Sequence, residues 1–339
     1  MSPQVEPNEA KRVTLATVAR HAQVHVSTAS RALSDDPAGV GADTVRRVRE
    51  LAEMLGYRRD AGAAALRTGS SRLIGVLVHR LTDLALATMY DSIDAAAAAA
   101  GYSAVVANTL DDPAHRSARL DALMSRRVDG IIIADSHLGD TVGYDLQRRG
   151  IPYVLAMRTL PGLLSVSTDD HTGGRLAAEH LHSLGHTRVA VIAGDLQAST
   201  GIERSQGFLR FFEAAGHPVP EDHVVSSGFG TAAGRSAGEK LMALPKPPTA
   251  IFAVDDLTAI GAMGAIREAG LRLRDDVALV GYNDIDLAAN LPVPLTSVRS
   301  DLEEMGRLAV DALLRRINGQ EATPILLPPV LVPRATTVP

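Results

Sequence analysis

Short, continuous runs of apolar residues recur along most of this chain, and they constrain its fold more than any other feature. Each run is followed by a stretch in which apolar residues return at helical spacing. Alternation of this kind is typical of parallel strands that are covered by helices on both faces. The runs occupy residues 73–78, 104–107, 130–134, 153–156, 189–193, 224–226, 250–254 and 277–280.

Eight strand-and-helix units over about 210 residues are more than one open sheet comfortably holds. The spacing of the runs also changes around residues 160–162, where the sequence is Leu-Pro-Gly. We therefore expect an α/β body made of two doubly wound parallel lobes. Ligands of such sheets bind beyond the carboxyl ends of the strands, so a ligand cleft is expected between the lobes.

The N-terminal part has a different pattern, in which short amphipathic helices follow one another without apolar runs. Residues 14–33 predict two short helices joined at 22–25, with Val18, Ala29 and Leu33 between them. The second helix would then present Val26, Ser27, Thr28 and Arg31 to solvent. Such side chains can contact thymine methyls, phosphates and guanine edges in a major groove. The alternative is an ordinary helical hairpin, because helix-turn-helix patterns are degenerate.

Charge is distributed unevenly between the two parts of the chain. Residues 11–72 hold eleven Lys and Arg against six Asp and Glu, whereas residues 73–339 hold 23 against 31. A basic front end on an acidic body is typical of a DNA-binding headpiece on a ligand-binding domain. Chance variation of surface charge is the alternative. Residues 58–72 between them are small and polar, with little to bury, and are interpreted as a linker.

Several classes of function are disfavoured by composition. The chain has no cysteine, which excludes disulfides, thiolate metal sites and a cysteine nucleophile. His182 and His186 have metal-ligand spacing, but no carboxylate joins them in an H-E-x-x-H arrangement. The Asp111-Asp112 pair is interpreted as a turn. No phosphate-binding or nucleophile motif occurs, so we expect no catalytic residue, no metal and no cofactor, and an enzyme is disfavoured.

A membrane location is also disfavoured. The first ten residues are polar and contain no apolar signal segment, and the alanine run at 95–100 is too short to span a bilayer. We therefore expect a cytoplasmic protein.

An ordered set of motifs after residue 13 resembles the LacI/GalR family of transcriptional repressors. No single motif is highly specific, but their order is. The motifs are TLATVA from Thr14, VSTASRAL from Val26, LGY from Leu55, RTG from Arg67, VDGII from Val128, GHTRVA from Gly185, RSQGF from Arg204, GYND from Gly281 and LTSV from Leu295.

The resemblance implies a homodimer that binds a pseudo-palindromic operator in double-stranded DNA. Leu66 corresponds to a hinge leucine that wedges into the minor groove at the operator centre. The residues implied to contact DNA are Thr14, Val26, Ser27, Thr28, Arg31, Ala63 and Leu66. The chain departs from the family where His25 replaces the serine that opens the second helix, which predicts a weaker cap unless Ser27 compensates. Arg59-Asp60 replaces Pro-Asn, and Gly62 predicts a looser hinge helix.

Polar side chains follow the predicted strands and are candidates for contact with a small effector. The candidates are Asp135, Arg204, Asp255 and Asn283, with His79, Arg80 and Asp83 as weaker ones. Several acceptors and one forked donor suit a sugar or related polyol. The family commonly has Asn-Asp at 255–256 and Asp at 283, so the exchange here predicts a sugar-like effector bound in an altered orientation. The alternative is that Asp255 or Asn283 merely caps a loop or helix.

The expected layout is a tail (1–12), a helix-turn-helix domain (13–58), a hinge (59–71) and an effector-binding and dimerisation domain (72–339). The first lobe would comprise about 72–163 and 296–323, and the second about 164–293 and 324–339. The dimer interface is expected near residues 91–100, 124–127 and 229–244. The predicted function is a repressor whose operator affinity is controlled by the effector. The alternative is a two-lobed sugar receptor without DNA regulation, which would need a signal peptide and have no use for residues 14–69.

Overall fold

A computed structural model describes residues 13–34, 37–57 and 69–338, and the chain divides into two compact units, 1–71 and 72–339. Ala63 and Leu66, expected to contact DNA, lie outside the described residues. The first unit contains three helices, α1 (Leu15–His21), α2 (Val26–Ala32) and α3 (Ala42–Met54). Its core is made of small apolar side chains from all three helices, namely Val18, Ala19, Ala22, Ala29, Ala32, Val48 and Ala52.

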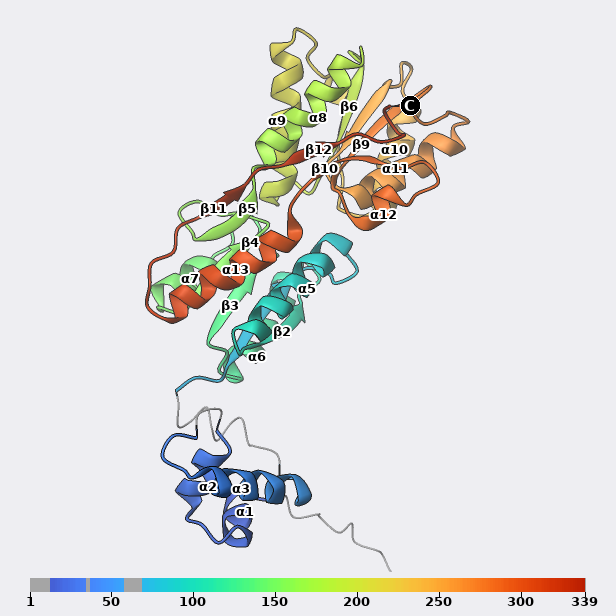
Figure 1. Ribbon diagram of the computed structural model, residues 1–339. Coiled ribbons are helices and arrows are strands. Elements are labelled where there is room, and N and C mark those ends of the chain that lie inside the picture. The colour runs from blue at the N-terminus through green and yellow to red at the C-terminus, as the bar shows by residue number, and fades with distance from the viewer. Residues whose placement is uncertain (1–12, 35–36, 58–68, 339) are drawn as a thin grey trace, which may run out of the picture. The chain divides into compact units, whose positions relative to one another are not determined.

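The second unit is built on two six-stranded sheets, which define a first and a second lobe (Figure 1). The first sheet has the order β11-β5-β4-β3-β1-β2, and the strands pair in parallel. Its strands are β1 (Leu73–Val78), β2 (Ser103–Asn108), β3 (Gly130–Ile133), β4 (Tyr153–Ala156), β5 (Ser165–Thr168) and β11 (Ile325–Leu327). Helices α5 (Leu84–Ala99) and α13 (Leu302–Ile317) pack on one face, and α6 (Pro113–Ser125) and α7 (Val142–Arg148) on the other.

The second sheet has the order β12-β10-β9-β8-β6-β7, and β12 alone runs antiparallel to its neighbour. Its strands are β6 (Val189–Gly194), β7 (Val224–Ser226), β8 (Ala250–Ala253), β9 (Ala278–Asn283), β10 (Thr296–Arg299) and β12 (Val330–Val332). Helices α8 (Asp170–Ser183) and α9 (Ser199–Ala214) cover one face, and α10 (Thr231–Met242) and α11 (Asp256–Glu268) the other. Two short helices, η1 (Glu221–His223) and α12 (Asp286–Ala289), complete the lobe.

The expected α/β architecture of two parallel lobes is confirmed, and each predicted apolar run is a strand. The lobe boundaries differ from those expected, because the chain crosses between lobes after β5, after β10 and after β11. Strand β10 pairs with β9 and therefore completes the second sheet before the chain crosses, although residues 296–299 were expected in the first lobe. Strand β11 pairs with β5 and belongs to the first. No helix among the described residues is long and apolar enough to cross a bilayer.

Candidate DNA-binding and effector sites

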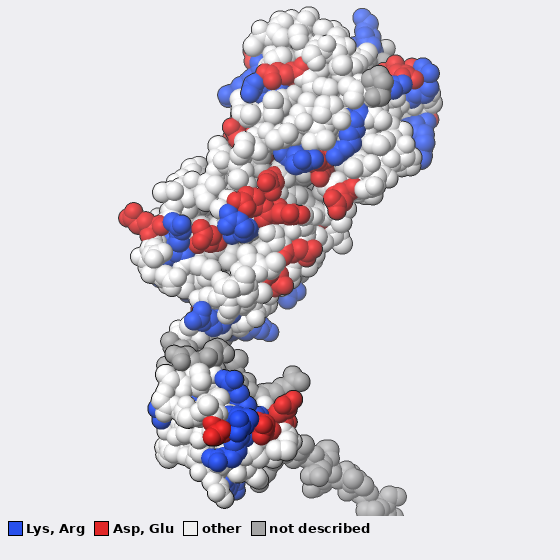
Figure 2. All heavy atoms as spheres, in the orientation of Figure 1, with Lys and Arg blue, Asp and Glu red and all other residues white. Residues whose placement is uncertain are grey.

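Helix α2 presents the expected DNA-contacting side chains to solvent. Val26, Ser27 and Arg31 are exposed and Thr28 is half-buried, whereas Ala29 and Ala32 on the opposite face are buried in the core of the unit. Lys and Arg side chains form a band across the face of this unit that is seen in Figure 2. The helix therefore offers a mixed apolar, hydroxyl and guanidinium surface, which is the chemistry needed to contact base edges and phosphates.

The ends of these helices are held by specific side chains. Thr14 caps α1 by accepting a hydrogen bond from the Thr17 amide at 3.3 Å. The imidazole Nδ1 of His25 accepts from the Ser27 amide at 3.2 Å and lies 2.8 Å from the Ser27 hydroxyl. The helix is therefore capped at His25, where the ring nitrogen takes the place of the usual hydroxyl, and the weaker cap remains a prediction. Arg49 donates to the Ala32 carbonyl at 3.1 Å and fixes the other end of α2 against α3.

A cavity of about 620 Å³ lies between the two lobes of the second unit, at the carboxyl ends of the strands. This volume is in the range of small-molecule sites. The first lobe contributes His79, Arg80, Thr82, Asp83 and Asp111. The second lobe contributes Asp195, Gly228, Phe229, Gly230, Thr231, Ala232, Ala233, Asp255 and Leu257. We call this cavity the cleft. Of the four expected effector residues, Asp255 lines it.

Asp255 serves both as a helix cap and as a wall of the cleft. Its carboxylate caps α11, accepting from the Thr258 amide at 2.9 Å and from the Thr258 hydroxyl. Burial raises the pKa of Asp255 to about 6, although the bonds from Thr258 oppose the shift, and the negative charge of Asp83 adds to it. Asp255 therefore caps α11 and also lines the cleft, and its contact with an effector remains a prediction.

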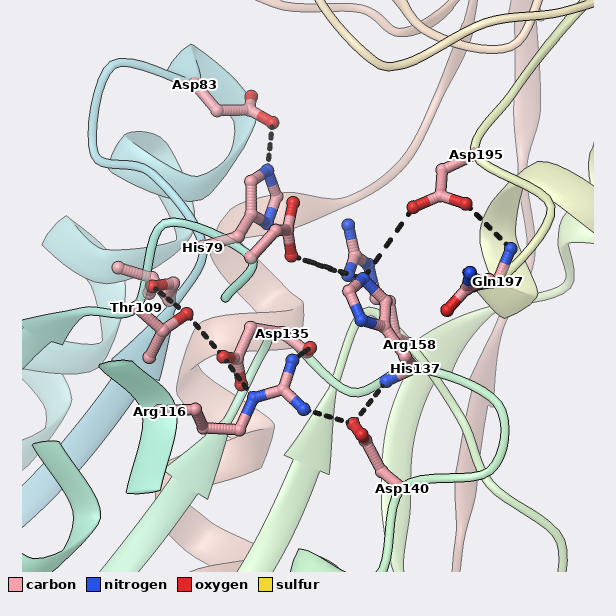
Figure 3. Close-up of polar contacts among 12 residues, drawn as sticks. His79, Asp83, Thr109, Arg116, Asp135, His137, Asp140, Arg158, Asp195 and Gln197 are labelled. Atoms are coloured by element: carbon pink, nitrogen blue, oxygen red, sulfur yellow. Dashed lines mark hydrogen bonds and ion pairs between the residues drawn. The ribbon is translucent and has the colours of Figure 1, made fainter. Parts of the chain in front are cut away.

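Asp135 instead lies inside the first lobe, where it is fully buried (Figure 3). Its carboxylate accepts from Arg116 Nε at 2.8 Å and from the Thr109 hydroxyl at 2.5 Å, and its backbone carbonyl accepts from Arg116 Nη2 at 2.6 Å. Arg116 Nη1 also donates to Asp140 at 2.5 Å, and Asp140 in turn accepts from the His137 amide. These bonds hold the loop after β3 and place His137 near the cleft.

Arg204 lies within the second lobe and is not among the residues that line the cleft. Its Nε donates to Asp170 at 2.7 Å, its Nη1 donates to the Val254 carbonyl at 2.8 Å, and its guanidinium stacks 3.7 Å from the centre of the Tyr282 ring. Burial raises the pKa of Asp170, while the Arg204 charge opposes the shift. Arg204 thus ties α9 to α8 and to the end of β8, and two of its donor groups are used inside the protein.

Asn283 ends β9 with a left-handed backbone (φ 97°) and lines a separate cavity of about 420 Å³. Its side-chain oxygen is 3.4 Å from the Ser300 hydroxyl. The neighbouring Asp284 accepts hydrogen bonds from Arg299 at 2.8 Å and Arg334 at 2.5 Å. Asp255 and Asn283 therefore do not line one cavity in this structure.

Sequence reasoning missed a group of charged and aromatic side chains where the lobes meet. His137 Nε2 lies 3.2 Å from Asp111 and 3.8 Å from Asp195 of the opposite lobe. Arg158 Nη1 is 3.4 Å from Asp111, and its guanidinium lies 5.6 Å from the centre of the Phe229 ring. Burial alone would raise the pKa of Asp111, but His137 and Arg158 outweigh it and hold that pKa well below its usual range.

The signal that could have found these residues is their place in the chain. Asp111, Arg158 and Asp195 each follow a strand within three residues, at the edge where the cleft lies. Asp111 does stand in a turn, with φ 55°, but its carboxylate also faces the cleft. Among the described residues, no group of three or more His, Asp or Glu side chains is placed to hold a metal ion.

Two family models match the chain. The model described as "Bacterial regulatory proteins, lacI family" matches residues 14–60, and the "Periplasmic binding protein-like domain" matches residues 178–337. The ribose operon repressor of Escherichia coli (strain K12) is 30% identical over 324 residues, covering 93% of this chain and 98% of that repressor. The HTH-type transcriptional repressor PurR of Aliivibrio salmonicida (strain LFI1238) is 30% identical over 308 residues, covering 90% and 92%.

Solved structures agree with the sequence relatives. The lac repressor dimer bound to operator and the anti-inducer ONPF matches with a TM-score of 0.88 at 28% identity, covering 97% of this chain and 100% of that one. The transcriptional regulator CelR in complex with cellobiose matches with a TM-score of 0.73 at 29% identity, covering 96% and 100%. The chain therefore belongs to the lacI family of bacterial regulatory proteins, with a DNA-binding headpiece followed by a periplasmic-binding-protein-like effector domain.

Proposed function

We propose that this lacI-family regulator is a cytoplasmic repressor that binds a pseudo-palindromic operator as a homodimer and responds to a small, sugar-like effector. The observation that carries the proposal is the capped helix α2, whose exposed face holds Val26, Ser27 and Arg31. Relatives named as repressors, and a solved lac repressor dimer on its operator, support the same function and favour a regulator over an enzyme.

Each headpiece would place α2 in a major groove. Arg31 would donate to a guanine edge, Ser27 would contact a base edge or phosphate, and Val26 would meet a thymine methyl group. Thr14 and Thr28 would contact the phosphate backbone. Ala63 and Leu66 remain predictions for the minor groove at the operator centre. Two headpieces of one dimer would then read two half-sites in opposite orientations.

The cleft would bind the effector between the lobes, with Asp255 as a direct contact. Asp135 and Arg204 would act indirectly, since they hold the loop after β3 and the helices of the second lobe. An effector changes operator affinity only through its different affinities for the two conformations of the regulator. Induction and corepression both satisfy this condition.

Selection of a random duplex library on the full-length protein tests the DNA-binding part. We expect a pseudo-palindrome to be enriched, with one base position per half-site relaxed by Arg31→Ala and the central step relaxed by Leu66→Ala. Arg119→Ala, on an exposed position of the second unit, is the matched control and should leave the selected sequence unchanged. If the protein enriches no sequence, with or without added sugars and purines, a sugar receptor without DNA regulation becomes the better explanation.

A further inference from the structure

We propose that the effector carries a protonated amine, as an amino sugar or other amino polyol does, and that Asp195 and Asp255 of the second lobe bind it. The inference rests on the proposed effector function of the cleft and names the chemical class of the ligand. It follows from which polar groups reach the cleft and which are used elsewhere.

The two donors that the sequence analysis expected to contact a sugar, Arg204 and Asn283, are not on the cleft wall. A hydroxyl both donates and accepts, so sites for neutral sugars offer donors as well as acceptors. Arg204 does not line the cleft, and its Nε and Nη1 are engaged with Asp170 and the Val254 carbonyl. The amide of Asn283 lines the separate cavity. Without them, the side chains that line the cleft include four carboxylates, Asp83, Asp111, Asp195 and Asp255, against donors at Arg80, Thr82 and Thr231.

The described residues of the second lobe that line the cleft include two carboxylates, one aromatic ring and no cationic side chain. Asp195 Oδ1 accepts from the Gln197 amide at 2.8 Å, and of the described side chains only His137 approaches Asp195 Oδ2, at 3.8 Å. Asp255 is bonded to Thr258, a neutral partner. Carboxylates form a favourable environment for an ammonium group through charge-assisted hydrogen bonds.

The basic side chains that approach this wall come from the first lobe, and two of them, His79 and Arg158, have carboxylate partners there. His79 Nε2 is 3.3 Å from Asp83, and Arg158 is 3.4 Å from Asp111, while Arg80 is exposed. The Arg158 guanidinium also lies over the Phe229 ring of the second lobe. A cationic group of the protein itself therefore already occupies the face of this ring.

His79 is a further polar side chain of the cleft wall. The residue is 5% exposed and lines the cleft, and its Nδ1 is buried without a hydrogen-bond partner. An ammonium group has three donors and no acceptor, so it matches an acceptor-rich cleft better than a hydroxyl does. A volume of about 620 Å³ leaves room for the rest of an amino sugar.

Matched pairs of sugars test the inference by calorimetric titration of the full-length protein near neutral pH. The probes are glucose, galactose and mannose, each with its 2-amino and its N-acetylamino derivative, because acetylation removes the charge but keeps the nitrogen. We expect at least one amino sugar to bind about tenfold or more tightly than both neutral forms, as a charge-assisted hydrogen bond predicts. Asp195→Asn and Asp255→Asn should each abolish that preference. Asp121→Asn, an exposed carboxylate on α6, is the control.

Contrary results separate the inference from the proposed function. If neutral sugars bind as tightly as their amines, and Phe229→Ala removes that binding, the effector cleft stands and the amine inference is wrong. If no amino sugar binds while the duplex selection yields an operator, the inference is wrong and the DNA-binding function stands. A preference for amines that survives both Asp→Asn variants also overturns it. Thermal unfolding of each variant verifies that loss of binding is not loss of fold.

Discussion

At the scale of single residues, buried charges in this protein hold loops rather than contact solvent. Arg116 is 2% exposed and donates to the side chain and backbone of Asp135 and to Asp140. These bonds span the loop after β3, from which His137 approaches the second lobe. Removing one partner of a buried ion pair leaves the other charge buried without compensation. This destabilises a protein more than replacing both partners by apolar side chains does.

Replacing Arg116 by methionine should therefore lower the free energy of unfolding by about 3–5 kcal/mol, because Asp135 stays buried without its partner. Denaturant unfolding followed by circular dichroism measures the change. Arg119→Met on the same helix is exposed and should change the free energy by less than about 0.5 kcal/mol. Equal effects of the two substitutions would show that Arg116 does not stabilise the loop through charge.

A second buried carboxyl group, Asp256, couples stability to pH. It accepts from the Ser297 hydroxyl at 2.6 Å and from the Ile285 amide at 2.9 Å. Burial, together with the charges of Asp255 and Asp284, raises the pKa of Asp256 to about 8, although the two hydrogen bonds lower it. In the unfolded chain the pKa is about 3.9. The folded state thus binds more protons between these values, and the stabilising contribution of this group is lost as pH rises from about 4 through 8.

Asp256→Asn should remove this pH dependence, because an amide mimics the protonated acid. Its nitrogen can donate to Ser297 and its oxygen can accept from the Ile285 amide. The free energy of unfolding of the variant, relative to the unsubstituted protein, should rise as pH increases from about 4 to about 8. Calorimetric unfolding at several pH values measures the difference, and Asp121→Asn provides an exposed control. A difference that is constant with pH would mean that Asp256 is ionised in the folded protein.

At the scale of elements, the helix pairs of the second lobe pack backbone against backbone. In α8 and α9 a Cβ at Gly174 would lie 1.9 Å from the Arg204 carbonyl, and one at Gly207 would lie 2.0 Å from the His171 carbonyl. In α10 and α11 a Cβ at Gly261 would lie 2.1 Å from the Thr231 carbonyl. Carbonyl groups of packed helices cannot move away without separating the helices, so these positions require glycine.

Helix α11 offers a matched pair of glycines for testing this packing. Gly261→Ala should lower the free energy of unfolding by about 1–3 kcal/mol, since the added methyl group forces the helices apart. Gly264→Ala should raise it by up to about 1 kcal/mol, because alanine is the better helix former. Its Cβ would meet only the flexible end of Arg235, at 3.4 Å. Thermal unfolding compares the two, and a loss of stability at both positions would contradict the explanation from packing.

Elements with apolar runs could be predicted from the sequence, but four short strands could not. Strand β10 contains Thr296 and Ser297, which are buried polar residues. The Thr296 hydroxyl donates to the Arg334 carbonyl and the Ser297 hydroxyl donates to Asp256, both about 40 residues away in the chain. Hydropathy cannot indicate that such a segment is a buried strand. Strands β5, β11 and β12 have only three or four residues and lie at or next to sheet edges.

Partners that are distant in the chain also limit prediction of the effector site. The position of a residue after a strand indicates the edge of the sheet at which it lies, and this placed Asp255 in the cleft. It does not indicate which partner the side chain binds. Arg204 binds Asp170, which lies 34 residues earlier in the chain. Asp135 binds Arg116, which lies 19 residues earlier. These pairings depend on how helices pack on the sheets, which local sequence patterns do not encode.

At the scale of the second unit, the two lobes are joined by direct contacts as well as by the chain crossings. The Leu138 amide donates to the Gln197 carbonyl at 2.7 Å, and the Thr159 amide donates to the Ser199 hydroxyl at 2.9 Å. His137 approaches Asp195 from the first lobe (Figure 3). An effector that reorients the lobes must break or shift these contacts, so they are a suitable place to block the motion.

Because the chain has no cysteine, two introduced cysteines can form a single, reducible disulfide between the lobes. Leu138 and Gln197 are exposed and share a backbone hydrogen bond, so cysteines at both positions are expected within the Cα separation that a disulfide requires. If lobe reorientation transmits the effector signal, oxidised Leu138→Cys/Gln197→Cys protein should hold one operator affinity with or without effector, while reduction restores the shift. Fluorescence titration of labelled operator measures both states, with Leu138→Cys alone as the control. Coupling requires two conformations that the effector distinguishes. A full effector response in the oxidised protein would therefore mean that these two conformations do not differ at the Leu138–Gln197 contact.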